Sequence, residues 1–536
     1  MDNHMINTDQ QALVAMPQVK VITKQDDIKE MKRKEKRFQT FGIGSFFYAL
    51  FYTFCLYHNA SGITYPFFAG GTLLFFGYFI RKSESSSADG KKEQTKAHIN
   101  KIFLMTSIII AGGLNCTTDS GVLIFFNKLL MLVLLGILLL QCWHDLTGWS
   151  ITAYIKGSMA MLFGGICHLF TPAGDMAACW HVRHISNEED EKNERNANRN
   201  RLLKSVGIGL VIVMPMVMFI AILLASADEV FRMLLRDILT FSIDIEVFEN
   251  SIKIILMIIV VFAVCYGLFA YNTIAENRKA IDNMAITEKV NWDSYIAVTV
   301  NGVMCVMYLV FSVIQIFGLF LGKLPEGYTY ASYARHGFFE LVFVCLFNII
   351  LVLCTLAYFE SSRLLRTLLT MICGCTYIMT ISSAYRMLLY ISSYQLTFLR
   401  LLVLWGLVMI AIVMTGVLVC IYNQQFSFIR FLLMVLTTGW LCFSAVHPDY
   451  WIASYNILAS DDSQEYDSYY LTKRLSLDAV AALPEEIYQD TDSSYYKRVK
   501  QYQSQKEEFM GARKFNFSRA YAGYKISIEG ERCELF

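Results

Sequence analysis

Long apolar runs, separated by polar connections, occupy most of the chain up to residue 446. A bilayer core about 30 Å thick requires about 20 apolar residues in a helix, because only a helix satisfies its own backbone hydrogen bonds there. The pattern therefore predicts an all-α integral membrane protein, a polytopic helix bundle with about 11 transmembrane helices. The predicted spans lie near 41–58, 62–80, 102–116, 121–141, 204–226, 252–271, 295–321, 338–358, 367–384, 400–421 and 429–446.

Two apolar segments fit this pattern poorly. The run at 102–116 is short for a span, and full crossing by 143–180 would carry the charged stretch that follows it to the wrong side. Tryptophan favours the headgroup level of a membrane, and Trp143, Trp149 and Trp180 flank the second segment. We therefore expect an interfacial or re-entrant helix near 143–180, and the sequence leaves open whether either segment crosses fully.

The basic residues of the connections predict an orientation. They gather in the N-terminal arm and in 81–101, 143–203 and 272–294, and loops rich in lysine and arginine are retained in the cytoplasm. The N-terminus is therefore predicted to be cytoplasmic. With an odd number of spans, the tail from 447 to 536 is predicted to be extracytoplasmic, since long segments translocate regardless of their charge.

These features divide the chain into five predicted parts. They are a cytoplasmic polar arm at 1–40, a front four-span unit at 41–141, a cytoplasmic interfacial helix and charged linker at 142–203, a seven-span core at 204–446 and an extracytoplasmic tail at 447–536. Polar and apolar residues alternate in the tail from Leu471 to Leu483. This alternation predicts small amphipathic helices that pack over the outer loops.

Composition supports the membrane assignment and narrows the partners. The chain has 536 residues, of which 55% are hydrophobic and 17% charged, whereas soluble proteins carry roughly 25% charged residues. The lipid bilayer is therefore the expected partner of the apolar excess. The net charge is +1, which argues against nucleic acid, since phosphate binding requires a concentrated basic surface. Most of the 14 cysteines lie in apolar runs, where a thiol packs as a small hydrophobe.

Motifs of several enzyme classes are missing from the sequence. There is no Gly-rich loop ending in Gly-Lys-Ser/Thr, no His-Glu-x-x-His and no Gly-x-Ser-x-Gly, which ATPases, zincins and α/β-hydrolases require. Five residues of types that ligate metals lie close together: Cys167, His168, Cys179, His181 and His184. Their spacing matches no standard zinc site. We therefore expect no catalytic residue, metal or cofactor, and lean against an enzyme.

Polar residues at the predicted outer ends of the later spans form the candidate site. They are Gln315, Tyr333, Arg335, Glu340, Arg386, Tyr390 and Arg400, and Asp228 is a further candidate. Ionisable residues at membrane depth usually face a partner or a water-filled cavity. A guanidinium fork matches a lipid phosphate or a carboxylate. The alternative is polar packing between helices, with Glu340 stabilising a helix N-terminus.

The same residues carry a resemblance to a known family. The matching blocks are Gln315 with Tyr330–Leu341, and Arg386, Leu389, Tyr390, Tyr394, Leu396, Thr397 and Arg400; weaker ones are Ala227–Phe231, His447–Asp449, Asn456, Asp467–Leu471 and Leu475–Leu483. They resemble a bacterial multi-spanning membrane protein family of unknown function, the domain of unknown function 4173 type, related to the 4153 type. Gln395 stands where the family usually has glycine, and Ala481 replaces a usual proline. The resemblance covers roughly 204–490 and implies a multi-pass protein of the bacterial cytoplasmic membrane, without implying an activity.

Three functions remain in competition. The first is a non-enzymatic envelope sensor, assembly or partner-binding protein, whose tail is ordered on the helix bundle. The second is a transporter or a protein that binds a lipid or another anionic ligand through the polar cluster. The sequence shows no internal repeat of the kind that transporters often carry, which favours headgroup recognition over transport. The third, an enzyme, would require a nucleophile, base or metal in mutual reach.

Overall fold

The computed structural model describes residues 24–86, 101–144, 146, 149–187, 224, 228, 245–285, 292–317, 338–423, 425–460, 467–488, 493–507 and 511–526. These residues are almost entirely helical, as the apolar runs predict. The first half contains α2 (Lys24–Leu56), α3 (Thr64–Ser86), α4 (Lys101–Thr117), α5 (Gly121–Trp143), α6 (Ile151–Cys167), α7 (Thr171–Asn187), α10 (Ile245–Thr273) and α11 (Ala275–Ala285). The long helices of the second half are α12 (Ser294–Gln315), α14 (Phe338–Tyr358), α15 (Arg363–Tyr394), α16 (Phe398–Tyr422) and α17 (Phe428–Ala445).

Seven of the described helices are long and apolar enough to cross a membrane. They are α5, α10, α12, α14, α15, α16 and α17, and each coincides with one predicted span. The helices α6 and α7 form a pair bent by 49°, which is a broken span or a re-entrant loop and raises the count to eight if it crosses. The protein is therefore a multi-pass membrane protein, and the unusual segment near 143–180 is bent at its middle.

The predicted count of 11 spans is not confirmed. Most of 41–58 and 62–80 lies in α2 and α3, but neither helix is among the seven, because glycine, threonine, tyrosine and charged residues dilute their apolar stretches. The helix α4 has 17 residues, which is short for a span. Apart from Leu224, the run at 204–226 lies outside the described residues.

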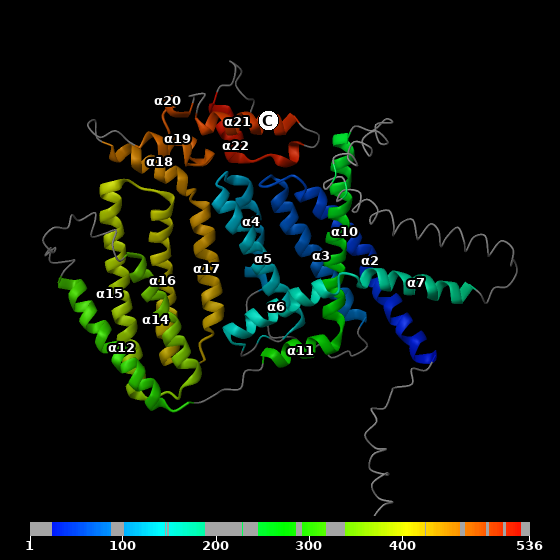
Figure 1. The fold of residues 1–536 in the computed structure, drawn as a ribbon, viewed down its shortest axis with the longest axis horizontal. Coiled ribbons are helices and arrows are strands. Elements are labelled where there is room, and N and C mark those ends of the chain that lie inside the picture. The colour runs from blue at the N-terminus through cyan, green and yellow to red at the C-terminus, as the bar shows by residue number, and fades with distance from the viewer. Residues whose placement is uncertain are drawn as a thin grey trace, which may run out of the picture. The chain divides into compact units, whose positions relative to one another are not determined.

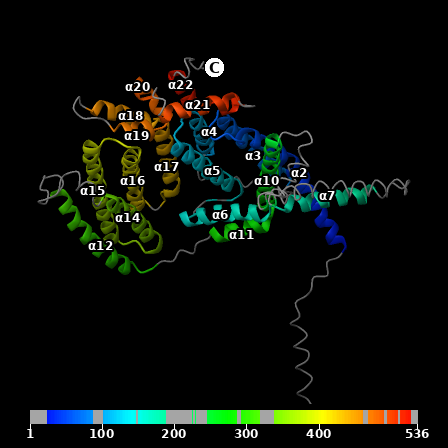
Figure 2. The same ribbon diagram turned by 45° about the horizontal axis from the view of Figure 1, so that its top comes forward.

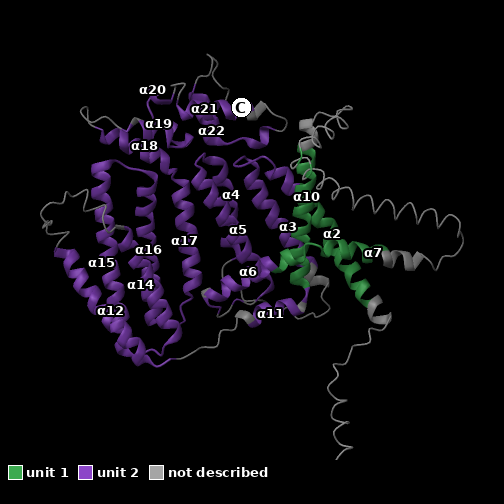
Figure 3. Cartoon of the chain, viewed as in Figure 1, with its two compact units in different colours: residues 1–50, 164–273 green, residues 51–163, 274–536 purple. Residues whose placement is uncertain are grey.

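The chain forms two compact units (Figure 3). Unit 1 comprises 1–50 and 164–273, and unit 2 comprises 51–163 and 274–536. Within unit 1, the side chain of Asp175 is almost fully buried and binds two partners. Arg37 donates to its two oxygens from Nε at 2.6 Å and Nη2 at 2.7 Å. Tyr266 donates its hydroxyl to the same carboxylate at 2.6 Å, so one buried charge connects α2, α7 and α10.

The spans of unit 2 pack around apolar cores. One core lies among α12, α14, α15 and α16, where Cys305, Cys345 and Cys373 are buried, as expected for thiols that act as small hydrophobes. The helix α17 also packs on α4 and α5. Trp440 donates from its indole to Asn127 on α5 at 2.8 Å, and Asn127 donates to Ser444 at 3.0 Å.

The tail folds into a layer of short helices across one end of the unit 2 spans (Figures 1 and 2). It comprises α18 (Pro448–Ala459), α19 (Ser468–Lys473), η2 (Leu477–Ala481), α20 (Glu485–Tyr488), α21 (Ser494–Glu507), η3 (Gly511–Lys514) and α22 (Phe517–Lys525). We call the described residues of this layer, within 448–526, the cap. Leu471, Leu475, Leu477, Tyr495 and Val499 are buried in its core. The described part of the tail is therefore helical, in agreement with the expected all-α fold.

Candidate functional site

Three of the predicted site residues line one cavity in unit 2. Arg386 is buried on α15 and donates from Nη2 to Oε1 of Gln315, the last residue of α12, at 2.9 Å. Ser382 donates to the same oxygen at 2.7 Å. Glu340, in the first turn of α14, lines the same cavity of about 390 Å³. Most of the other lining residues are apolar, among them Phe311.

The remaining predicted residues lie elsewhere. Arg400 stacks its guanidinium over the ring of Tyr390, 4.3 Å from the centroid, and donates to the backbone carbonyls of Tyr394 and Gln395. Gln395 has a φ of 64°, in the left-handed region that glycine adopts most readily. Arg400 therefore stabilises the turn between α15 and α16 and does not line the cavity of Glu340.

Three other candidates are not part of this cavity's described lining. Tyr333 and Arg335 lie outside the described residues. Asp228 is exposed, belongs to unit 1 and donates its backbone N–H to the carbonyl of Leu224 at 2.9 Å. Among the residues that the structure does describe, no group of three His, Cys, Asp or Glu side chains is arranged to hold a metal ion.

The turn between α15 and α16 is bound to the cap. The side-chain amide of Asn456, on α18, accepts from the N–H of Leu396 at 2.8 Å and donates to the carbonyl of Leu396 at 2.9 Å. The N–H of Phe398 donates to the hydroxyl of Tyr470, on α19, at 2.9 Å. Sequence blocks separated by 60 and 72 residues thus meet in space at this end of unit 2.

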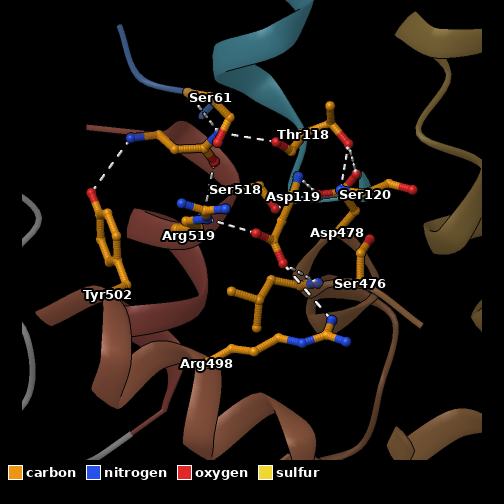
Figure 4. A network of polar contacts seen from close by, with 12 residues as sticks. Ser61, Thr118, Asp119, Ser120, Ser476, Asp478, Arg498, Tyr502, Ser518 and Arg519 are labelled. Carbon is orange, nitrogen blue, oxygen red and sulfur yellow. Dashed lines mark hydrogen bonds and ion pairs between the residues drawn. The ribbon is translucent and has the colours of Figure 1, made fainter. Parts of the chain in front are cut away.

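Asp478, in the 3₁₀ helix η2, is the centre of a larger polar network (Figure 4). Its carboxylate accepts from Oγ1 of Thr118, from the N–H of Asp119 at 2.8 Å, from Oγ of Ser518 at 2.5 Å and from Nδ1 of His447 at 3.3 Å. Burial raises the pKa of Asp478, but these donors outweigh it and hold the pKa below its usual value. One buried anion therefore joins the α4–α5 turn, the start of α18 and α22.

Asp119 is the second carboxylate of the network. Its Oδ1 accepts from Nε of Arg519 at 2.6 Å, and its Oδ2 lies 3.9 Å from Nη1 of Arg498. Arg498 also donates to the carbonyl of Leu475 at 2.9 Å. Near it, Asn516 donates its amide to the carbonyl of Thr118 at 2.9 Å, so Thr118 and Asp119 of the α4–α5 turn both bind the cap.

Asp449, in the first turn of α18, is the third carboxylate. It is 4% exposed and accepts from the N–H of Ser476 at 3.1 Å and from its hydroxyl at 2.5 Å. Burial, reinforced by the nearby charge of Asp478, raises the pKa of Asp449 to about 6. The neighbouring His447 has its pKa raised by the hydrogen bond to Asp478.

An open cavity of about 960 Å³ lies against this network. We call it the cap cavity. Its walls come from the connection between α2 and α3, the α4–α5 turn, Phe398 and the cap. Its charged lining residues are Arg474, Arg498, Lys514 and Arg519 against Asp119 and Asp449. Cationic side chains therefore outnumber carboxylates by four to two.

Sequence reasoning did not assign the cap cavity. His447, Asp449 and Asp478 fell within the blocks that carry the family resemblance, but none was named as a site residue. The partners of Asp119 were missed entirely, because Arg519 lies 400 residues away and no local period links them. The available signal was an aspartate in a very short turn between two apolar runs, where a charge requires a partner.

Comparison with known proteins identifies the family. The profile of the DUF4153 family, a domain of unknown function, matches residues 102–486, well over half of the chain. The chain belongs to the DUF4153 family. No curated protein and no solved structure matches it. The DUF4153 region contains Asp119, Asp449 and Asp478, whereas Arg498 and Arg519 follow it.

Proposed function

We propose that this DUF4153 protein is a non-enzymatic membrane protein that binds an anionic ligand in the cap cavity. The observation that carries the proposal is the surplus of cationic side chains around a cavity of about 960 Å³. Small-molecule sites commonly enclose roughly 300–1,000 Å³. Of the partner classes that the sequence suggested, an anionic lipid headgroup and an envelope protein, the cavity favours the headgroup.

The four cationic residues of the cap cavity have different surroundings. Arg519 and Arg498 lie beside Asp119, which offsets part of their charge. Arg474 is exposed, and its side chain makes no hydrogen bond or ion pair within the described part of the chain. Arg474 therefore offers its charge to a bound phosphate or carboxylate, for which a guanidinium fork is well shaped.

Ligand binding in this cavity would depend on whether the cap is docked on the bundle. The cavity has walls on both the cap and the bundle, so a ligand there contacts both at once. A ligand that binds only the docked state stabilises that state, and the stabilisation grows with the logarithm of the ligand concentration once the site is saturated. This coupling supports a sensor or assembly role over catalysis.

The proposal includes a topology. We propose 11 spans, a cytoplasmic N-terminus and an extracytoplasmic cap in a bacterial cytoplasmic membrane, and we also propose a relation to the 4173 type of domain of unknown function. The basic residues of 81–101 and 272–294 support this orientation. Single cysteines at 195 and 480, in a background without native thiols, would test it with an impermeant reagent on intact cells. Labelling at 195 but not at 480 would reverse the topology.

The binding experiment uses the purified full-length protein with glycerol phosphate as the probe. We expect the probe to raise the midpoint of thermal unfolding, and Arg474→Gln to weaken its apparent affinity about tenfold, equivalent to the loss of one charge-assisted contact. Lys500→Gln is the matched control, because Lys500 is exposed on α21 and does not line the cavity.

Two outcomes would overturn the proposal. One is an unfolding midpoint that glycerol phosphate does not move at any concentration. The other is an equal loss of affinity in Arg474→Gln and Lys500→Gln, which would reduce the effect to a general electrostatic one.

The cavity of Gln315, Glu340 and Arg386 carries a second candidate function, transport or anionic ligand binding in the core. The observation that favours it is the presence of an acidic and a basic side chain on one cavity. We expect Glu340→Gln to preserve abundance in the membrane and abolish the cellular phenotype. A loss of abundance would instead assign Glu340 to helix packing.

A further inference from the structure

An apolar groove lies between α16 and α17. It has a volume of about 900 Å³. Its walls include Leu401, Trp405 and Val408 on α16 and Phe431 and Cys442 on α17. Both helices are candidate membrane spans, so this groove lies at membrane depth, where an apolar group must occupy it.

One end of the groove approaches the cap cavity. Pro448 and Trp451 line the groove, whereas Asp449 lines the cap cavity. Phe398 also lines the cap cavity, and its ring packs on that of Phe443, a groove residue, with centroids 6.2 Å apart. A lining residue of the polar space and one of the apolar space are therefore in direct aromatic contact.

We infer that the cap cavity and the groove form one bipartite site for an anionic lipid, with the phosphate beside Arg474 and an acyl chain between α16 and α17. The inference rests on the proposed function and names its ligand class. A cationic cavity next to an apolar groove matches an anionic head joined to a hydrocarbon chain. Trp451 is 54% exposed where the two spaces approach, and tryptophan is enriched at the level of lipid headgroups.

The walls of the groove favour an acyl chain over a helix of a second copy. Helices associate in lipid through small residues, which allow their backbones to approach closely. Here the groove is lined by bulky side chains, among them Trp405, Met409, Phe431 and Trp451. Flexible chains fill such an irregular surface more readily than a second helix does.

The test compares a lipid with its headgroup alone. The protein is reconstituted in phosphatidylcholine nanodiscs with a minor fraction of dioleoyl phosphatidylglycerol, and the lipid that it retains after extraction into detergent is measured by native mass spectrometry. Thr438→Trp fills the groove from α17. Leu436→Trp is the control, because Leu436 is also exposed on α17 but does not line the groove.

We expect Thr438→Trp to lower the retention of phosphatidylglycerol about tenfold and to leave glycerol phosphate binding unchanged. Arg474→Gln should weaken both, and Leu436→Trp neither. Should Thr438→Trp fold poorly, which a loss of glycerol phosphate binding would reveal, Val408→Trp fills the groove from the opposite wall.

The outcomes separate the two proposals. Normal retention of phosphatidylglycerol in a groove-filling variant that still binds glycerol phosphate would overturn the bipartite site and leave the cap cavity standing. Loss of retention in Leu436→Trp as well would point to a general effect of tryptophan on the bilayer surface, and would also overturn it. Absence of glycerol phosphate binding in the parent protein would refute the proposed function itself.

Discussion

Asp449→Asn is expected to stabilise the cap at high pH. Asparagine keeps an oxygen that can accept both hydrogen bonds from Ser476, but it never ionises. Because burial raises the pKa of Asp449 to about 6, the folded cap binds this proton more tightly than the unfolded chain does. The favourable contribution of the neutral carboxyl is therefore fully present below about pH 4 and is lost as the pH rises through 6.

The magnitude follows from the difference between the two pKa values. A change from 3.8 to about 6 corresponds to about 3 kcal/mol, at 1.36 kcal/mol for each pKa unit. Ionised Asp449 thus costs the folded cap about 3 kcal/mol at pH 8 and about 1 kcal/mol at pH 4.5. The advantage of Asp449→Asn over the parent should shrink by about 2 kcal/mol between these pH values. Any constant cost of the amide cancels in this comparison.

The assay is denaturant unfolding of the full-length protein in detergent micelles at pH 4.5 and pH 8, followed by tryptophan fluorescence, to which Trp451 on α18 contributes. Asp467→Asn is the control, because Asp467 is an exposed N-cap residue in the same layer and asparagine is an equally good cap. A pH-independent effect of Asp449→Asn would refute the reasoning, as would a variant less stable relative to the parent at pH 8 than at pH 4.5.

Three further substitutions test other buried contacts. Asp478→Asn removes the charge that four donors share, so we expect the cap to lose about 3 kcal/mol of docking free energy and trypsin to cleave it faster, at unchanged membrane insertion. In unit 1, Asp175→Asn leaves Arg37 without its buried counter-charge and should also cost about 3 kcal/mol; a thermal midpoint equal to that of the parent would contradict this. Gly267→Ala places a methyl group 2.7 Å from the carbonyl oxygen of Gly165, and the forced shift should cost about 1–3 kcal/mol, measured by thermal unfolding.

The spans that sequence predicted best are those whose apolarity comes from the lipid-facing residues themselves. α14 and α16 are examples, because exposed residues such as Phe343 and Val408 are as apolar as buried ones. Prediction was weaker for α2 and α3, where glycine, tyrosine and threonine are frequent. The composition of a helix indicates whether its surface can face lipid. It does not show where that helix packs in the bundle.

The candidate site was predictable only where residues lie at neighbouring helix ends. Gln315 and Arg386 were grouped because their spans end on the same predicted side, and they do form a hydrogen bond. Arg400 was grouped by the same reasoning, yet its guanidinium binds the carbonyls of its own turn. The order of the spans predicts the side of the membrane on which a residue lies. The direction of a long side chain depends instead on its immediate neighbours.

The large sequence separation between the cap carboxylates and their partners determines when the cap can dock during synthesis. Thr118 precedes its partner Asp478 by 360 residues, and Arg519 joins Asp119 across 400. During synthesis the turn between α4 and α5 is complete long before Asp478 or Arg519 leaves the ribosome. Asp119 therefore has neither of these partners while the later spans are inserted. Closure of the cap therefore follows synthesis of the later spans, and until then the turn lacks its contacts with Asp478 and Arg519.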